Sequence, residues 1–129
     1  MEFVCKTYVK EFNKKKGEML YRHLPDNVFV KDKGIRVDRQ VKHNGKMKTV
    51  TFFVSQDGEW YNATEAMAGL KISGIYFKTA KSVVKALNNL NDSNLKELCD
   101  FYQSNDGRLK KMQGFLTRNS EDTIIYEEV

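Results

Sequence analysis

The sequence predicts a single small α+β domain in which antiparallel hairpins precede three helices. Residues 35–54 contain two stretches of alternating apolar and polar residues joined by an Asn-Gly pair, which is typical of a β-hairpin. Residues 75–90 place apolar side chains at helical spacing. The chain has 129 residues, 40% of them hydrophobic, which is enough to bury one core without disulfides or metal. We expect an N-terminal arm and hairpins over 1–55, a helical part over 62–105 and a C-terminal segment over 108–129.

The N-terminal segment is compatible with two structures. Alternation over Phe3, Cys5 and Thr7 favours a strand, whereas the apolar spacing over 8–12 suits a short helix. A basic loop follows at 13–18, and its lysines are expected to be exposed because like charges repel. They either contact phosphates or only solubilise the loop, and they are Lys14, Lys15 and Lys16.

Strand signals dominate the next part of the chain. A Pro-Asp-Asn turn at 25–27 precedes the β-rich run 28–30. Within 35–54, the pair Asn44-Gly45 predicts a type I′ turn because both residues tolerate positive φ. A cationic hairpin tip can reach a DNA groove or backbone, or it can simply blunt a strand edge. The tip residues are Lys42, His43, Lys46 and Lys48.

A second turn at 56–59 leads into a predicted short helix over 63–68 that stops near Gly69. Asn62 is placed to act as the N-cap, and Glu65 can complete a capping box by reaching back to its N–H. The alanines of this segment would let another element pack closely. We expect its motif to be architectural, with roles in the turn, packing and capping for Gly58, Trp60, Asn62, Ala63, Thr64 and Glu65.

A longer, basic amphipathic helix is predicted over 75–90. Its apolar stripe is Tyr76, Ala80, Val83, Val84, Leu87 and Leu90. No acidic residue occurs between Glu65 and Asp92. The polar side is therefore suited to contacting phosphates and base edges. It carries Lys78, Thr79, Lys81, Ser82 and Lys85.

A third helix is predicted over 94–104, capped by the polar residues that begin at Asn91. The tail has two interpretations. A turn cluster at 119–122 favours a closing hairpin whose better strand is 123–126, whereas residues 108–117 can also be read as helical.

Charge is distributed unevenly along the chain. The formal net charge is +5, and residues 1–48 carry 13 Lys and Arg against 6 Asp and Glu, whereas residues 49–129 carry 9 against 11. Such a distribution favours a polyanionic partner on one face.

Targeting and cysteine signals are weak or absent. No run approaches the roughly 18 apolar residues needed for a membrane span, and the N-terminus does not resemble a signal peptide. Cys5 and Cys99 each lie among apolar neighbours with no CxxC pair, so we expect two buried, reduced thiols. We expect a soluble, intracellular protein with no membrane partner.

The sequence does not predict an enzyme. Metal-dependent nucleases need spaced acids with a lysine, and the residues around Asp26 and Asp32-Lys33 lack the (D/E)xK spacing. No phosphate-binding glycine loop, HExxH, GxSxG or Cys/His cluster occurs. We therefore expect no catalytic residues, no metal and no cofactor.

The segment 57–87 resembles two related families of DNA-virus and phage domains. The triplet Asn62-Ala63-Thr64, after a glycine turn and an aromatic residue, is similar to the signature of the KilA-N family. The same stretch, from Gly58-Glu59 and Trp60-Tyr61 to Leu70, resembles the Bro-N family, the N-terminal domain of baculovirus repeated ORF proteins. The tryptophan that usually follows the triplet is missing, and Lys71 stands where a glycine is expected. The resemblance implies a small viral DNA-binding module that acts in the nucleus or cytoplasm of an infected host cell.

Two functional hypotheses follow. The first is binding of double-stranded DNA, or of RNA, through the basic helix and the hairpin tip, with help from Lys14–Lys16. The second is a protein-interaction or host-modulating module that meets an acidic protein without nucleic acid. The exposed edge of the 35–54 hairpin could also pair two copies into a homodimer.

Overall fold

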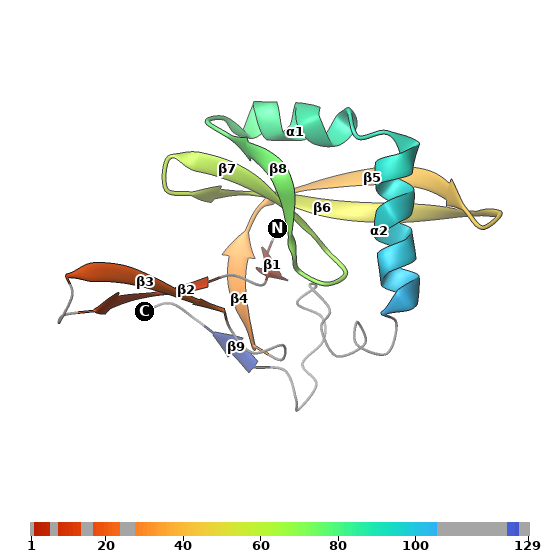
Figure 1. Cartoon of the computed structure of the whole chain (residues 1–129). Helices are drawn as coiled ribbons and strands as arrows, with labels where there is room; N and C mark the ends of the chain where they lie inside the picture. Colours follow the sequence, from red (N-terminus) through yellow and green to blue (C-terminus); the bar gives the residue numbers. More distant parts are fainter. Residues whose placement is uncertain (1, 6–7, 14–16, 24–27, 106–123, 127–129) are drawn as a thin grey trace.

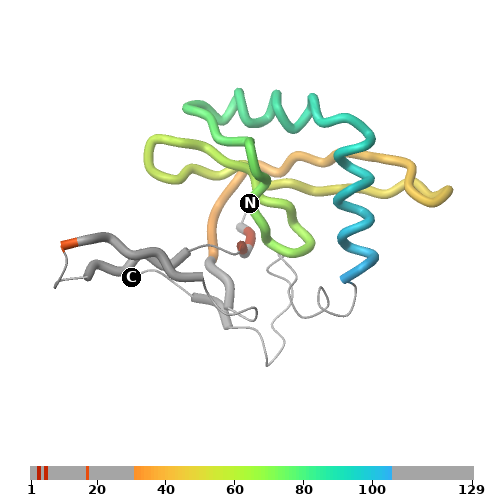
Figure 2. Tube along the Cα trace, viewed as in Figure 1, coloured from red at the N-terminus to blue at the C-terminus, as the bar shows by residue number. Residues whose placement is uncertain are grey.

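The computed structural model describes residues 2–5, 8–13, 17–23, 28–105 and 124–126. Side-chain surroundings are described over 31–105 and at Phe3 and Cys5, and the exposure of Gly17 is also described. These are the coloured parts of the trace in Figure 2. The loop lysines Lys14–Lys16 and most of the C-terminal tail lie outside the described residues. The predicted contact at Lys14–Lys16 and the choice between hairpin and helix over 108–117 are therefore not addressed by the structure.

A four-stranded antiparallel sheet forms the centre of the molecule (Figure 1). Its strands are β5 (Ile35–His43), β6 (Lys46–Asp57), β7 (Trp60–Glu65) and β8 (Lys71–Phe77), and they lie in the order β5-β6-β7-β8. Each strand pairs with the next in sequence, so the sheet is a meander. The predicted α+β fold class is confirmed.

The Asn-Gly turn is confirmed between β5 and β6. Asn44 and Gly45 have φ values of 52° and 78°, as a type I′ turn requires, and His43 pairs with Lys46 across it. The turn prediction at 56–59 is also confirmed, because Asp57 pairs with Trp60 and Gly58 has a φ of 62°. Both turns therefore formed where local residue chemistry predicted them.

Two helices cover one face of the sheet. Helix α1 (Ala80–Asn88) begins at Thr79, whose side chain accepts from the Ser82 N–H. Helix α2 (Asp92–Ser104) begins at Asn91, where Asn91 and Asn94 form a reciprocal capping box. The prediction of a helix over 94–104 with a cap beginning at Asn91 is confirmed.

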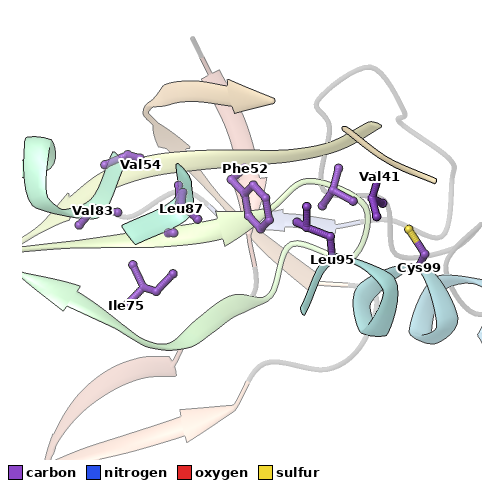
Figure 3. Close-up of a cluster of buried hydrophobic side chains, with 10 residues drawn as sticks. Val41, Phe52, Val54, Ile75, Val83, Leu87, Leu95 and Cys99 are labelled. Atoms are coloured by element: carbon purple, nitrogen blue, oxygen red, sulfur yellow. The ribbon is translucent and has the colours of Figure 1, made fainter. Parts of the chain in front are cut away.

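The main core lies between these helices and the sheet (Figure 3). Alternate residues of β6 point into it, because successive side chains of a strand face opposite sides. Helix α1 contributes Val83 and Leu87, and α2 contributes Leu95 and Cys99. The strands contribute Val41, Val50, Phe52, Val54, Ala63 and Ile75.

A second sheet lies against the opposite face. Strands β1 (Glu2–Cys5), β4 (Val28–Lys33) and β9 (Ile124–Tyr126) form it in the order β1-β4-β9, with β9 parallel to β4. Strands β2 (Tyr8–Asn13) and β3 (Glu18–His23) form a separate hairpin. The strand interpretation of the N-terminus is confirmed, as is the strand predicted at 28–30, and the strand predicted at 123–126 is confirmed over its described residues 124–126.

Phe3 joins the two sheets. Its ring stacks on that of Phe53 with centroids 4.7 Å apart, and both side chains are fully buried. Cys5 and Ala66 complete this small second core. The chain passes from β4 to β5 through Gly34, where a Cβ atom would lie 2.6 Å from the Val54 carbonyl oxygen. Glycine is therefore required at this junction for lack of space.

The short helix predicted over 63–68 is wrong. Residues 60–65 form β7, an inner strand that pairs with β6 on one side and β8 on the other. Asn62 is not a helix cap, because its buried side chain accepts a hydrogen bond from the Ser55 hydroxyl. Hydrogen bonding on both edges of the strand overrides the helical preference of the alanines.

The helix predicted over 75–90 begins later than expected. Residues 71–77 form β8, with Ile75 in the core, so Tyr76 belongs to a strand and Lys78 to the connection that follows. Apolar residues at 75 and 77 alternate, and Thr79 provides an N-cap that stops the helix from extending back. Consequently the region 62–105 contains two strands as well as two helices.

Candidate nucleic-acid interface

The β5–β6 hairpin presents two free cations at its tip. The side chains of Lys42 and Lys46 are exposed and, among the described residues, make no ion pair. Met47, beside them, is 65% exposed. Figure 1 shows the tip extending past α2. The tip therefore offers positive charge at a projecting point of the molecule.

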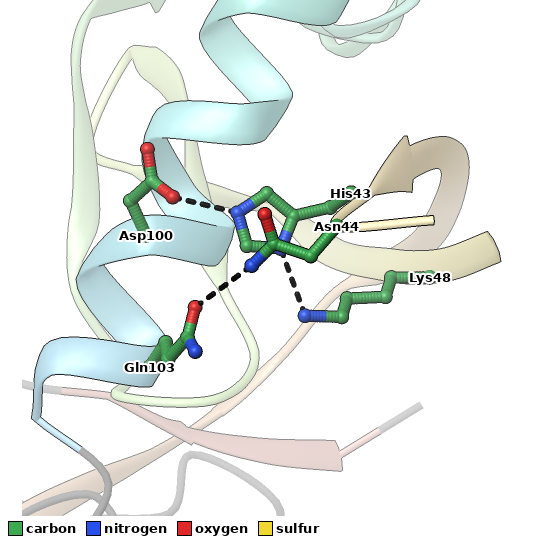
Figure 4. Close-up of polar contacts among 5 residues, drawn as sticks. All are labelled: His43, Asn44, Lys48, Asp100 and Gln103. Atoms are coloured by element: carbon green, nitrogen blue, oxygen red, sulfur yellow. Dashed lines mark hydrogen bonds and ion pairs between the residues drawn. The ribbon is translucent and has the colours of Figure 1, made fainter. Parts of the chain in front are cut away.

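His43, which the sequence predicts as a nucleic-acid contact at the hairpin tip, faces α2 and not the solvent. It is only 5% exposed, and its Nε2 lies 2.6 Å from Oδ1 of Asp100 (Figure 4). Its Nδ1 lies 2.8 Å from Nζ of Lys48. A lysine ammonium can only donate, so Nδ1 accepts and the ring proton lies on Nε2, donating to Asp100.

This arrangement anchors the tip. Asn44 adds a further bond from its Nδ2 to Oε1 of Gln103, at 3.1 Å. Lys48 keeps its charge, but its ammonium is held by His43 and its side chain is less exposed than those of Lys42 and Lys46, so it is less able to reach a phosphate. The hairpin is thus held against α2 at its turn, which limits its freedom to bend.

The predicted helical contacts divide into three groups. Lys81 and Lys85 are exposed on α1, one turn apart, and make no ion pair within the described residues. Thr79 and Ser82 cap the helix, and the Thr79 hydroxyl donates to that of Ser82 at 2.8 Å. Lys78 lies 3.4 Å from Oε2 of Glu59. Among the predicted helical contacts, the positive charges without a carboxylate partner in the described residues are therefore those of Lys81 and Lys85.

The structure does not bring the hairpin tip and α1 into one surface. In Figure 1, α1 lies over β7 and β8, and α2 stands between it and the tip. The contacts agree, since α2 packs on β5 and β6 whereas α1 contacts β8 and β7 most closely. The predicted contact residues therefore form two separate basic groups. We call Lys42 and Lys46 the tip pair, and Lys81 and Lys85 the helix pair.

Glu65 has a structural role that differs from the predicted capping box. Its carboxylate is 2% exposed and accepts from the backbone N–H groups of Met67, Ala68 and Leu70 at 2.9–3.1 Å. The Tyr102 hydroxyl donates to it at 2.7 Å. Burial, together with the adjacent carboxylate, raises the pKa of Tyr102. Glu65 therefore reaches forward to hold the β7–β8 turn against α2.

Arg39 is a structural residue that the sequence analysis did not single out. Its guanidinium donates to the carbonyls of Leu87 and Leu90, near the C-terminal end of α1. Carbonyls at a helix end have no partner within the helix. The only sequence signal was an arginine at a position that alternation assigns to the inner face of β5. A charged residue there indicates a buried polar partner.

Two cavities flank the C-terminal half of α2. One of about 420 Å³ is lined by residues that include Leu70, Ile72, Leu98 and Phe101. The other, of about 600 Å³, is lined by residues that include Met67 and Cys99. Burial raises the pKa of the Cys99 thiol. The prediction of two buried, unpaired cysteines is confirmed.

Comparisons with protein-family models, with curated proteins and with solved structures find no match to this chain. The resemblance of 57–87 to the KilA-N and Bro-N families thus stays a prediction. No helix in the described ranges is long and apolar enough to cross a membrane. Nor do three His, Cys, Asp or Glu side chains gather as a metal site within those ranges.

Proposed function

We propose that this protein binds nucleic acid, in the first place double-stranded DNA, as a regulatory module of the kind that the KilA-N and Bro-N resemblance implies. The observation that carries the proposal is the presence of two exposed lysine pairs that have no carboxylate partner among the residues the structure describes. The tip pair sits on a hairpin fixed by His43, and the helix pair sits on α1. Phosphate contacts need lysines that are not already neutralised.

The number of phosphates contacted predicts the salt dependence. Each contact contributes about −0.9 to the slope of log affinity against log salt. One lysine pair therefore predicts a slope of about −2, and both pairs together predict about −4. From 50 to 200 mM salt, affinity should then fall by about 10-fold or about 100-fold.

Fluorescence anisotropy with a labelled duplex at these two salt concentrations tests the proposal. Glutamine variants of Lys42 and Lys46, and of Lys81 and Lys85, identify the pair in use, because replacing the pair that contacts the duplex should weaken binding and reduce the magnitude of the slope by about 2. Lys96→Gln is the matched control, because Lys96 is exposed on α2 and lies in neither pair. Absence of duplex binding at 50 mM salt would end the proposal.

The alternative is an acidic protein partner. Partly exposed apolar side chains beside α2 favour it, since Met67, Leu70 and Phe101 are each 36–38% exposed near the two cavities. Under this alternative the lysine pairs steer a protein, and Leu70 and Phe101 contact it. The wild-type protein would then not bind DNA, and the lysine variants would lose only the protein partner.

A further inference from the structure

The sheet carries an aromatic pair on the face opposite the helices. Ile75 and Ala63 point into the helix-side core, so their neighbours Tyr76 and Asn62 point the other way. Trp60 lies two residues before Asn62 and shares its face. The rings of Trp60 and Tyr76 stack with centroids 4.8 Å apart and planes within 10°.

This pair is accessible. Tyr76 is 49% exposed, and Trp60 is partly exposed. One face of the Tyr76 ring contacts Trp60, so the exposed area lies on its other face and edges. The Phe3 end of the same sheet face is covered by β1, whereas this end retains an uncovered ring. A flat aromatic surface is therefore open to solvent.

Charged groups surround the pair. Nζ of Lys78 lies 4.5 Å from the centre of the Trp60 ring and 3.4 Å from Glu59. Lys71 lies 3.9 Å from Asp57, so these acids partly neutralise the lysines of the sheet. Beyond Lys78 the chain enters α1, which covers the opposite face of the sheet, so Lys81 and Lys85 belong to the helix pair and not to this group. Lys78 thus brings positive charge to the Trp60 ring and shares it with Glu59.

We propose that Tyr76 and Trp60 form a stacking site for an unpaired base of single-stranded DNA, with Lys78 exchanging Glu59 for the adjacent phosphate. Aromatic rings beside cations bind single strands because every base has a π-face and every nucleotide a negative charge. The bases of a duplex are already stacked on one another and cannot stack on an aromatic side chain as well. The site goes beyond the proposed function, because it uses a different surface and an unpaired form of DNA.

A titration of the full chain with labelled oligo-dT tests this site. Oligo-dT has little structure of its own, and Trp60 is the only tryptophan of the chain, so its emission reports on the site directly. Wild-type protein should bind in anisotropy at about 50 mM salt, with a saturable change in Trp60 emission. Loss of one stacked base predicts roughly 5- to 140-fold weaker binding for Tyr76→Leu.

Two matched variants control this measurement. Tyr76→Phe keeps the ring and should bind within about 2-fold of wild type. Phe77→Leu removes a 37%-exposed aromatic from the next position, on the other face of the strand, and should leave binding unchanged. Glu59→Gln frees Lys78 from its ion pair and should strengthen binding. Thermal unfolding of each variant verifies that the sheet is intact.

The outcomes separate this site from duplex binding. Under our inference, Tyr76→Leu weakens oligo-dT binding but not duplex binding, and the tip-pair variant does the reverse. Equal oligo-dT affinity in Tyr76→Leu and wild type overturns the inference, whatever the duplex results are. So does wild-type protein that forms dimers which Tyr76→Leu disrupts, because the surface is then an interface between copies.

Discussion

Replacing Glu65 by glutamine is expected to destabilise the protein strongly, although it removes a buried charge. Burying an isolated carboxylate is costly, and on that ground alone the neutral amide would be the more stable residue. The carboxylate of Glu65, however, accepts bonds from three backbone N–H groups and from the Tyr102 hydroxyl. An amide NH₂ in place of either carboxylate oxygen removes the acceptor of at least one of these donors.

The expected magnitude follows from the donors left unpaired. An NH₂ at the Oε2 position strands the Met67 N–H, because the Tyr102 hydroxyl can turn to accept from it, and an NH₂ at the Oε1 position strands the Leu70 N–H, because Ala68 N also reaches Oε2. Each buried unsatisfied group costs about 1–3 kcal/mol, which predicts about 1–3 kcal/mol for Glu65→Gln. Tyr102→Phe removes one bond to a charged acceptor and should cost about 1.5–3 kcal/mol. Either change is large beside a total stability of about 5–15 kcal/mol.

Urea unfolding followed by Trp60 emission measures both effects. Glu97→Gln is the control, because Glu97 is exposed on α2 and its replacement should change stability by less than about 0.5 kcal/mol. Combining Glu65→Gln with Tyr102→Phe should cost less than the sum of the two, since both remove the same bond. If Glu65→Gln equals or exceeds wild type in stability, the desolvation cost of the buried carboxylate outweighs the hydrogen bonds that it accepts, and the prediction is wrong.

Two further predictions concern the junction between the sheets. Burial, with a smaller contribution from Asp32, raises the pKa of Cys5 from 9.0 to about 11, so a disulfide reagent at pH 8 should modify it only after unfolding. A thiol that reacts rapidly in the native protein would contradict this burial. Gly34→Ala would place a Cβ atom 2.6 Å from the Val54 carbonyl and 3.0 Å from the Phe3 ring, and should lower stability by about 1–3 kcal/mol in urea unfolding. An unchanged unfolding midpoint would show that the two sheets can move apart at Gly34 without loss of stability.

Local signals predicted the elements that local chemistry fixes. The Asn44-Gly45 pair predicted the turn of the β5–β6 hairpin, because the backbone conformation at the turn depends on these residues alone. The polar residues from Asn91 onward predicted the start of α2, where a capping box forms. In both cases the information lies within four residues of the feature it determines.

Non-local pairing explains the elements that were missed. Residues 62–68 contain helix-forming alanines and a cap-like Asn and Glu, yet β7 forms because β6 and β8 flank it. The same competition moved the start of α1 from 75 to 80. The free energy that helix propensity contributes over seven residues is smaller than the free energy gained when an inner strand forms hydrogen bonds on both edges.

The candidate site was predicted by residue type but not by geometry. The sequence identifies lysines, but it does not show that Lys48 is held by His43 and Lys78 by Glu59. Nor does it show that Trp60 and Tyr76, sixteen positions apart, stack on one another. These pairings depend on the register of the strands, which a single sequence does not specify at this distance.

The position of α2 decides how the two lysine pairs can act. This helix stands between the tip pair and the helix pair, and it exposes Asp92, Glu97 and Asp100. A duplex that touched both pairs would have to pass these carboxylates, whose repulsion opposes contact. We therefore expect one duplex to use one pair, with a salt slope nearer −2 than −4. A slope of about −4 would require the phosphate backbone to avoid α2 by bending around it.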